Sequence, residues 1–386
     1  MRTFANLLNP ISPSDFIDQY WTQKAIIISD NNPKKFADLF SWESLNQILN
    51  LYPLKSPEIR LSQSGKKFQP IQTAQDIIQS CQSGATLVVD CLHQKNENIA
   101  KLAEQLRLEL GHRIQVNSYS SPGEQQGFTC HYDSHEVFIL QISGQKHWRV
   151  FPESFPYPTS ETPSSQFTPP ETNPYLEQTL NPGELLYIPR GHWHYAIAAA
   201  EPSLHLTLGI DGPTGIDFSD WLTEQLQTSP QWRQTLPFLN INYRSACREH
   251  LQQLIETWRE KIEQDNLIER YLDEQYLKGQ PSRQFSFPAQ LSHPQFPNGL
   301  LTQFYRPQQP VLIETNPNIE GYTLKTGEKK IALSGLEFSS LEKIFTAENF
   351  TGLDVQNWLA DFDWDTEIIP LLTQLVQNGI LLVVTS

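Results

Sequence analysis

The stretch from 113 to 210 constrains the fold most, because it consists of short apolar or alternating runs without helical patterns between them. RIQVNSYS alternates like a half-buried strand, and FTCHYDSHEVFILQI leads through a glycine-centred turn into KHWRVF, a pattern typical of a hairpin. Strand patterns resume in GELLYIPRGHWHYAIA and SLHLTLGI. Short strands punctuated by Gly and Pro favour an antiparallel barrel or double sheet.

The region before these strands is predicted to contain helices as well as strands. Residues 12–29 read as a helix with Ser12 or Ser14 as the N-cap, followed by the strand KAIIIS. Residues 73–90 repeat this order, with a helix that ends on a glycine and then the strand ATLVVD. Residues 152–182, rich in Pro, Ser and Thr, are predicted to be a long loop without a regular element, and such loops are usually functional or mobile.

The pattern changes near 217. Leu251, Leu254, Ile255, Trp258 and Ile262 fall on one helical face, and helices dominate to about 279. Residues 280–311 are expected to be a linker with short strands. The last hundred residues contain three helical patterns and the closing strand GILLVV, which is compatible with a small winged-helix unit. The predicted domains are a catalytic domain at 1–212, a helical region at 213–280 and a winged-helix-like domain at 281–386.

Composition sets limits on compartment and partners. The chain has 386 residues, enough for two or three domains, and a formal net charge of -15, which repels a phosphate backbone. No run of about 18 apolar residues and no signal-peptide pattern occurs, so we predict a cytoplasmic protein without membrane association. The cysteines show no Cys-x-x-Cys spacing and are expected to be reduced and structural; they are Cys81, Cys91, Cys130 and Cys247.

Two polar residues inside the strand region suggest metal chemistry. His131 and Asp133 are two positions apart, and such residues point to the same side of a strand. An imidazole and a carboxylate suit iron(II), and one more histidine would complete a face that leaves coordination positions open. The stretch YIPRGHWHYA offers His192 or His194 as that third ligand, and His205 is a further candidate, although a core histidine is its commoner explanation.

The blocks HYDSHEVFILQISGQKHWRVF and NPGELLYIPRGHWH resemble the JmjC-type cupin oxygenases, in particular the ribosomal oxygenase group of iron- and 2-oxoglutarate-dependent protein hydroxylases. The resemblance implies a mainly β jelly-roll (double-stranded β-helix) catalytic domain, a helical dimerisation region and an α+β winged-helix-like C-terminal domain. This order agrees with the three patterns along the chain. It is most specific in 111–210 and weak beyond 280.

The resemblance also implies roles for individual residues. The metal triad would be His131, Asp133 and His194, since the family places its distal ligand three residues after the glycine of the Pro-x-Gly turn. His192 then becomes a supporting residue, and His135 lies outside the motif. The 2-oxoglutarate anchor would be Lys146, because a dicarboxylate bound at one end to iron needs a cation at the other. Matching positions also implicate three weaker candidates for cosubstrate binding, namely Asn117, Tyr119 and Thr207.

The predicted function is hydroxylation of a protein side chain with Fe(II), 2-oxoglutarate and molecular oxygen. The resemblance implies a ribosomal protein as substrate, with arginine or histidine as the modified residue, and an acidic surface would attract such a basic partner. Two other classes remain open: a cupin that holds a non-redox metal with His192 as a fourth ligand, and a winged-helix regulator without catalysis. Residues 281–386 hold six Lys and Arg against eleven Asp and Glu, which disfavours nucleic-acid binding.

The helix at 251–262 is predicted to form a homodimer contact with Trp258 at its centre. The alternative is that this apolar face packs against the barrel of its own chain. Arg190, in the turn before the distal histidine, is expected to be merely exposed.

Overall fold

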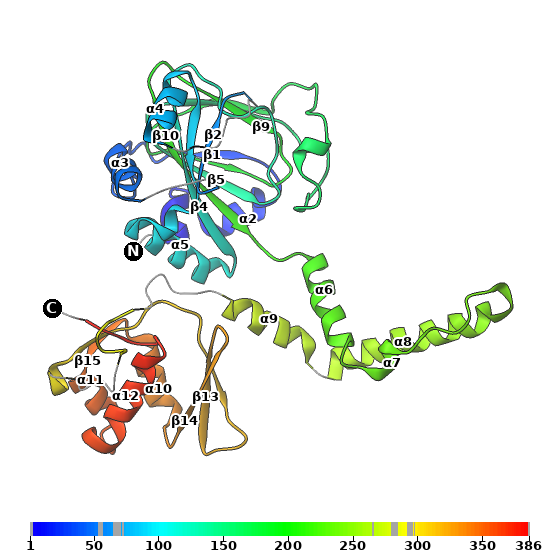
Figure 1. Cartoon of the computed structure of the whole chain (residues 1–386), viewed down its shortest axis with the longest axis vertical. Coiled ribbons are helices and arrows are strands. Elements are labelled where there is room, and N and C mark those ends of the chain that lie inside the picture. Colours follow the sequence, from blue (N-terminus) through cyan, green and yellow to red (C-terminus); the bar gives the residue numbers. More distant parts are fainter. Residues whose placement is uncertain are drawn as a thin grey trace. The chain divides into compact units, whose positions relative to one another are not determined.

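The computed structural model describes residues 3–52, 57–64, 71, 73–264, 266–278, 285–291, 296 and 298–384. It divides into two compact units, Met1–Gly212 and Pro213–Ser386, which are treated separately below (Figure 1). The finer division into three domains stays a prediction.

The first unit is built on a seven-stranded antiparallel sheet with the order β1-β8-β5-β10-β4-β3-β2. Its inner strand β5 has apolar residues along most of its length, because both of its edges and both of its faces are covered. The strands are β1 (Ile26–Ile28), β2 (Ile59–Ser62), β3 (Thr86–Val89), β4 (Arg113–Ser121), β5 (Glu136–Ser143), β8 (Leu185–Ile188) and β10 (Ser203–Asp211).

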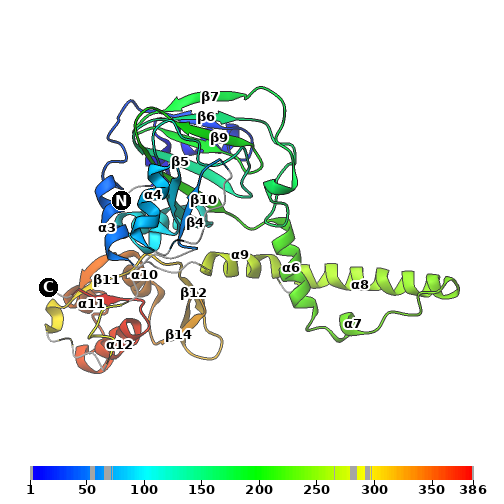
Figure 2. The same ribbon diagram turned by 45° about the horizontal axis from the view of Figure 1, so that its top comes forward.

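A three-stranded sheet, β7-β6-β9, lies across the large sheet (Figure 2). Its strands are β7 (Leu176–Leu180), β6 (Lys146–Val150) and β9 (His194–Ala198). The hairpin predicted from the turn at Gly144 is wrong, although both of its strands are present. Strand β5 already pairs with β8 and β10, so β6 leaves that sheet after the turn and pairs with β7 and β9.

Helices α1, α2, α3 and α5 of the first unit pack on one face of the large sheet. Ser12 caps α2 by accepting a hydrogen bond from the Asp15 amide, and Gly84 ends the segment of α4 with a positive φ, as the sequence predicts. A continuous core includes Phe16, Phe138 and Leu206. The helices are α1 (Phe4–Leu8), α2 (Pro13–Gln19), α3 (Trp42–Leu51), α4 (Ala74–Gln82) and α5 (Glu97–Leu110), with a 3-10 turn at Leu92–Gln94.

The long segment 152–182 is less irregular than predicted. It contains a 3-10 turn at Ser164–Gln166, and strand β7 occupies its end. The composition of the segment does not predict this strand, because β7 forms by pairing with the available edge of β6 rather than through a strong local pattern.

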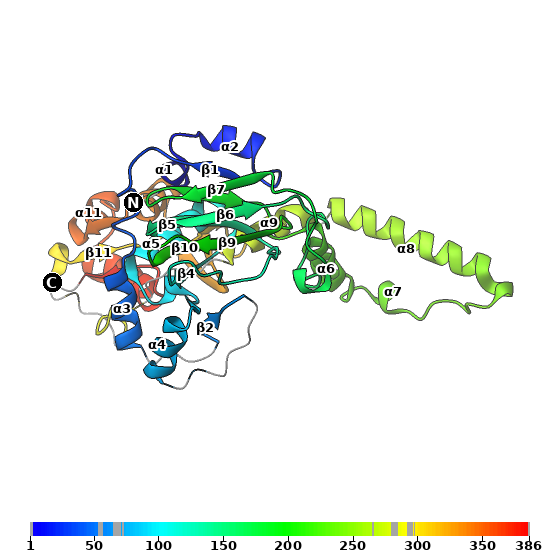
Figure 3. The same cartoon turned by 90° about the horizontal axis from the view of Figure 1, so that it is seen from above.

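The second unit begins with four helices. The helix predicted at 251–262 is part of the longer α8, and the chain segment around α7 runs beside it (Figure 3). Trp258 packs edge-on against Trp232, with ring centroids 5.6 Å apart, and contributes to a small cluster with Trp221 and Tyr271. The helices are α6 (Gly215–Leu226), α7 (Pro230–Arg233), α8 (Arg244–Gln264) and α9 (Leu267–Leu277), with a 3-10 turn at Ile241–Tyr243.

The remainder of the second unit has its own core, centred on Phe304, Ile344 and Leu372. Two three-stranded sheets have the orders β15-β11-β16 and β12-β13-β14. Part of the predicted linker 280–311 lies outside the described residues. The elements are a 3-10 turn at Gly299–Leu301, β11 (Gln303–Tyr305), β12 (Leu312–Thr315), β13 (Gly321–Thr326), β14 (Lys329–Ser334), α10 (Phe338–Thr346), β15 (Asn349–Thr351), α11 (Gly352–Trp358), a π-helical turn at Trp364–Ile368, α12 (Ile369–Gln377) and β16 (Leu382–Val383).

The three C-terminal helical patterns and the closing strand are therefore present. The sequence interpretation missed the β12-β13-β14 sheet, although alternation in GYTLKT and KKIALS around Gly327 indicates a hairpin. Among the described residues, none of the helices is both long and apolar enough to cross a membrane.

Candidate metal centre

The three residues predicted to bind a metal come together where two chain segments meet. His131 and Asp133 precede β5 rather than lying within a regular strand, and His194 begins β9. The backbones of His131 and His194 form a bridge with two hydrogen bonds, of 3.1 and 2.7 Å. The amide of Gly191 also donates to the carbonyl of Asp133, at 2.9 Å. These bonds fix the Pro-Arg-Gly turn beside the His-x-Asp segment.

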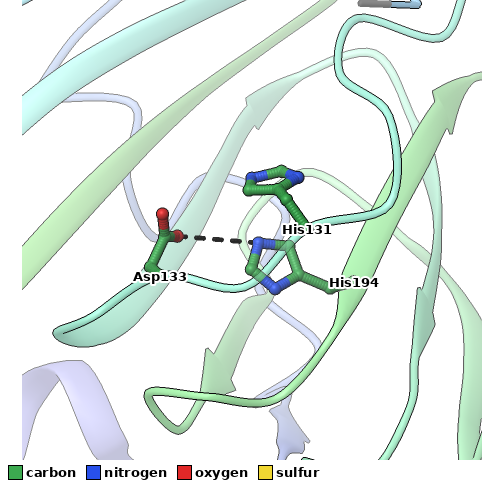
Figure 4. Close-up of side chains that lie close together, drawn as sticks. All are labelled: His131, Asp133 and His194. Atoms are coloured by element: carbon green, nitrogen blue, oxygen red, sulfur yellow. Dashed lines mark ion pairs between the residues drawn. The ribbon is translucent and has the colours of Figure 1, made fainter. Parts of the chain in front are cut away.

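The three side chains point toward one another (Figure 4). One donor atom from each of His131, Asp133 and His194 lies within 4.8 Å of the others. Asp133 Oδ2 is 3.6 Å from His194 Nε2. Tyr132, between the first two, is buried on the opposite side, so the alternation expected of an extended segment holds although the segment is not a sheet strand.

Hydrogen bonds to the backbone set the tautomers of both histidines. His131 Nδ1 lies 2.7 Å from the carbonyl oxygen of Thr129, and His194 Nδ1 lies 3.0 Å from that of His192. A carbonyl can only accept, so each Nδ1 carries the proton in the neutral ring and each Nε2 keeps its lone pair. This is the form in which an imidazole binds a metal, and a backbone carbonyl is a common partner for a ligating histidine.

Burial and charge favour a cation at this position. Burial, with a smaller effect from neighbouring His131, lowers the pKa of His194 to about 4, so its ring is neutral at pH 7. Burial opposes ionisation of Asp133, but the nearby imidazoles of His131 and His194 hold the pKa of that carboxyl below its ordinary value. Two neutral imidazoles and one carboxylate form a donor set that fits iron(II).

A second functional group lies at another end of the same cavity. Lys146, the first residue of β6, is only 4% exposed and lines the cavity with the three candidate ligands. Its ammonium donates to the hydroxyl of Ser121 at 2.9 Å, and that hydroxyl lies 2.8 Å from the Thr86 hydroxyl. Burial lowers the pKa of Lys146 to about 7. Within the described part of the chain, no carboxylate forms an ion pair with Lys146, so the amine is suited to an acidic ligand.

Other predicted cosubstrate residues divide into two groups. Tyr119 and Thr207 line the cavity, whereas Asn117 does not appear in its described lining. The Asn117 side-chain oxygen instead accepts from the Cys91 amide at 3.0 Å. His205 also lines the cavity, beside Tyr119. Cosubstrate binding by Asn117, Tyr119 and Thr207 stays a prediction.

The remaining histidines of the motif lie outside the triad. His192 Nδ1 is 2.7 Å from the Tyr175 hydroxyl, and its Nε2 is 3.2 Å from Glu153. Both ring nitrogens are therefore engaged elsewhere, which argues against a four-ligand shell. His135 is not in the described lining of the cavity, and it lies where a side chain at position 209 would clash with its ring.

Hydrogen bonds join the long segment after β6 to residues next to the candidate ligands. The Tyr132 hydroxyl donates to the Thr162 carbonyl at 2.9 Å, and the Trp193 indole donates to the Ser154 hydroxyl at 2.8 Å. Tyr132 and Trp193 meet edge-to-face, with centroids 4.9 Å apart. Because these two residues adjoin the ligand positions, the segment supports the site from outside the cavity. Arg190 lies in the nearby turn with its guanidinium over the Tyr157 ring, 5.5 Å from its centroid.

The fold and this site define the class of the protein. The model of the JmjC domain family matches residues 91–218, a range that contains all three candidate ligands and Lys146. Residues 91–218 therefore form a JmjC-type cupin domain with a sheet-rich core, and the chain has additional helical regions. The family resemblance predicted from the two motif blocks is confirmed.

Curated relatives narrow the comparison. The chain is 30% identical over 219 residues to the Dictyostelium discoideum bifunctional lysine-specific demethylase and histidyl-hydroxylase NO66, covering 53% of this chain and 42% of that protein. It is 31% identical over 223 residues to mouse ribosomal oxygenase 2, covering 53% of this chain and 46% of the relative. The chain thus spans less than half the length of these relatives.

Solved structures extend the likeness over the whole fold. The superposition with the Escherichia coli protein ycfD covers 97% of this chain and 98% of that chain, with a TM-score of 0.61 and 17% sequence identity. A structure of that ribosomal oxygenase in complex with cobalt and 2-oxoglutarate gives a TM-score of 0.60 at 17% identity, with 97% and 99% covered. At this identity the comparison shows a common fold.

Proposed function

We propose that this protein is an Fe(II)- and 2-oxoglutarate-dependent oxygenase that hydroxylates a protein side chain. One observation supports the proposal most strongly. Two imidazoles with free Nε2 lone pairs and one carboxylate face a cavity that is also lined by the buried Lys146, which has no carboxylate partner among the residues that the structure describes. A metal at the first position and a dicarboxylate reaching the second would satisfy both sets of groups.

Each group of the chain has a defined part in this proposal. His131, Asp133 and His194 would hold the iron, and the Thr129 and His192 carbonyls keep both imidazoles in the ligating tautomer. Bound iron would supply the oxidative chemistry, in which 2-oxoglutarate and oxygen yield succinate, CO2 and one hydroxyl on the target. Three protein ligands leave coordination positions for these reactants.

Lys146 would bind the carboxylate of 2-oxoglutarate farthest from the metal. A dicarboxylate arriving beside Lys146 favours the ammonium form, because an opposite charge offsets the cost of burying the cation. The Ser121 hydroxyl, within 2.9 Å of Nζ, holds the amine in place before the cosubstrate arrives. Tyr119 and Thr207, which line the same cavity, are the further candidates for polar contacts.

The proposed target is an arginine or histidine side chain of a ribosomal protein. This proposal is supported by the names of the relatives, which are ribosomal oxygenases and a histidyl-hydroxylase. Charge also favours a basic partner, since the chain has a formal net charge of -15. Residues 152–182 hold four glutamates and no Lys or Arg.

The proposal is tested by incubating the purified protein anaerobically with iron(II) and 2-oxoglutarate and recording its visible spectrum. A weak charge-transfer band is expected in the wild type and is lost in His194→Ala. His192→Ala is the matched control: it removes an imidazole two residues away whose nitrogens are engaged by Tyr175 and Glu153, so the band remains. Absence of the band in the wild type would reject the oxygenase assignment.

The target is tested by mass spectrometry of ribosomal proteins from cells with and without the gene. An addition of one oxygen on arginine or histidine that disappears with the gene supports the proposal. Modification that persists without the gene contradicts it.

We also propose the finer architecture implied by the resemblance: a jelly-roll catalytic domain, a helical dimerisation region at 213–280 and a winged-helix-like domain at 281–386. For the dimer, the supporting observation is an exposed apolar surface on α8, where Leu251 is 42% and Ile255 61% exposed. Trp258 itself packs against helices of its own chain, so Ile255 is the better centre for a contact between copies.

Light scattering at micromolar concentration tests the dimer. The wild type is expected at twice the chain mass and Ile255→Glu at the single-chain mass. Glu256→Gln, a change on the same helix without apolar character, serves as the control. A wild-type monomer would remove the dimer proposal. Direct nucleic-acid binding is not proposed, and location in the cytoplasm stays a prediction.

A further inference from the structure

His205 is a buried histidine on β10 that lines the cavity of Lys146, and its orientation is set by aromatic rings. It is only 2% exposed. Its ring lies parallel to that of Tyr119, with centroids 5.0 Å and planes 4° apart. Trp148 meets it edge-on at 5.7 Å and 74°. One ring from the paired strand β4 and one from β6 of the other sheet therefore hold the imidazole in one plane.

The polar atoms around His205 lack acceptors. His205 Nδ1 and Trp148 Nε1 are both buried without a hydrogen-bond partner among the described residues. Buried polar atoms are paired in the great majority of cases, so each exception needs an explanation. An indole nitrogen can only donate, and so can the Lys146 ammonium. This end of the cavity thus holds more donors than acceptors, and a carboxylate, which only accepts, complements it.

We propose that His205 is a second binding residue for the distal carboxylate of 2-oxoglutarate, donating one imidazole N–H beside the Lys146 ammonium. The inference rests on the proposed oxygenase function and adds a residue to its cosubstrate site. Burial, and after it the positive charge of Lys146, holds the pKa of His205 well below its ordinary value. A neutral imidazole retains one N–H donor, so the ring can serve this role without adding a second buried charge.

The competing explanation is that His205 only fills space in the barrel. His205→Phe separates the two, because phenylalanine retains a flat ring for stacking on Tyr119 and removes both nitrogens. His205→Gln provides the complementary change, since its amide keeps an N–H donor but loses the ring. Thermal unfolding of both variants shows whether either has lost its fold.

The experiment measures, by calorimetry, the Kd of 2-oxoglutarate and of 2-oxovalerate for the Mn(II)-loaded protein. The Kd of the weaker ligand is obtained by letting it compete with the tighter one. 2-Oxovalerate has the same carbon chain without the distal carboxylate. We expect His205→Phe to raise the Kd of 2-oxoglutarate about tenfold, the size typical of losing one hydrogen bond to a charged group, and to leave that of 2-oxovalerate and of Mn(II) unchanged. His205→Gln should recover most of the loss, to within about threefold of wild type.

Unchanged 2-oxoglutarate binding in His205→Phe would overturn the inference and leave the oxygenase proposal intact. Equal losses for both ligands would also overturn it, since they indicate a disturbed cavity rather than a missing carboxylate contact. If the phenylalanine variant does not fold, His205→Leu, which also lacks an N–H donor, decides by the same comparison of the two ligands. A wild type that binds Mn(II) but no 2-oxoglutarate would reject the proposed function and this inference together.

Discussion

The two ends of the cavity are built in different ways. At the metal end, His131 and Asp133 precede a strand and His194 begins one, and backbone hydrogen bonds join the two segments. At the far end, Lys146 and His205 belong to strands of different sheets and are almost fully buried. The metal end depends on local backbone geometry, whereas the far end depends on how two sheets face each other. Substitutions at the two ends should therefore change metal binding, cosubstrate binding and stability in different ways.

The largest expected effect is at the metal end. Removing a residue that only orients a metal ligand typically lowers affinity about 10- to 100-fold, so removing a ligand should cost more. We expect His194→Ala to weaken Mn(II) binding by more than about 100-fold, measured by calorimetric titration. His192→Ala should bind as the wild type does. Equal losses in both variants would show that the site is not the triad proposed.

At the far end, Lys146→Met should separate ligand binding from stability. Loss of a buried charge partner is expected to raise the Kd of 2-oxoglutarate about 100-fold or more. The same substitution should make the free protein more stable. Because the folded-state pKa of Lys146 is about 7, below its unfolded value, the buried charge destabilises the free protein progressively as pH falls from the unfolded pKa to 7 and fully below it.

Lys146→Met should therefore unfold at a higher temperature than the wild type at pH 6, without cosubstrate, with a smaller difference at pH 9. Calorimetry at both pH values measures this. A variant that loses stability along with 2-oxoglutarate affinity would mean that the ammonium is structural rather than a binding group.

A smaller effect is expected from pH. Binding of 2-oxoglutarate requires the ammonium form of Lys146, whose pKa is about 7 in the free protein. The Kd should be nearly constant below pH 6 and rise about tenfold between pH 6 and pH 8. Lys146→Arg provides the control, because a guanidinium stays protonated throughout this range. The same rise in the arginine variant would assign the dependence to another group.

The smallest effect is expected from Tyr132, which packs outside the cavity next to the candidate metal ligands. Tyr132→Phe removes one hydrogen bond, from the hydroxyl to the Thr162 carbonyl, and keeps the ring against Trp193. We expect a loss of about 1 kcal/mol in the free energy of unfolding, measured with denaturant. Mn(II) affinity should change by less than about threefold, since backbone bonds hold the ligand segments. A loss like that of His194→Ala would show that the long segment controls the ligands directly.

The same contrast explains what the sequence could predict. The triad residues lie in two short motifs, and the structure brings those three side chains together. Their selection over His192 needed the family resemblance, because spacing alone left both histidines open. The hydrogen bonds of His192 with Tyr175 and Glu153 depend on tertiary contacts that spacing does not encode.

Residues at the far end were harder to find. His205 and Ser121 are isolated strand positions, and their positions beside Lys146 follow only from the packing of the two sheets. The single sequence signal for His205 is an imidazole between two leucines of a mainly apolar strand. The hairpin error has a similar origin, since the turn at Gly144 is local but the partners of β5 and β6 are not.

The bridge between His131 and His194 also has a consequence for folding. It joins residues far apart in sequence and closes the intervening chain, including the long segment behind the site, into one loop. Contacts of this kind form only after the entropy of loop closure has been overcome, so the ligand positions should assemble late. An ion bound there would stabilise the contact between the two ligand segments in the folded domain, and its main kinetic effect would be to slow unfolding.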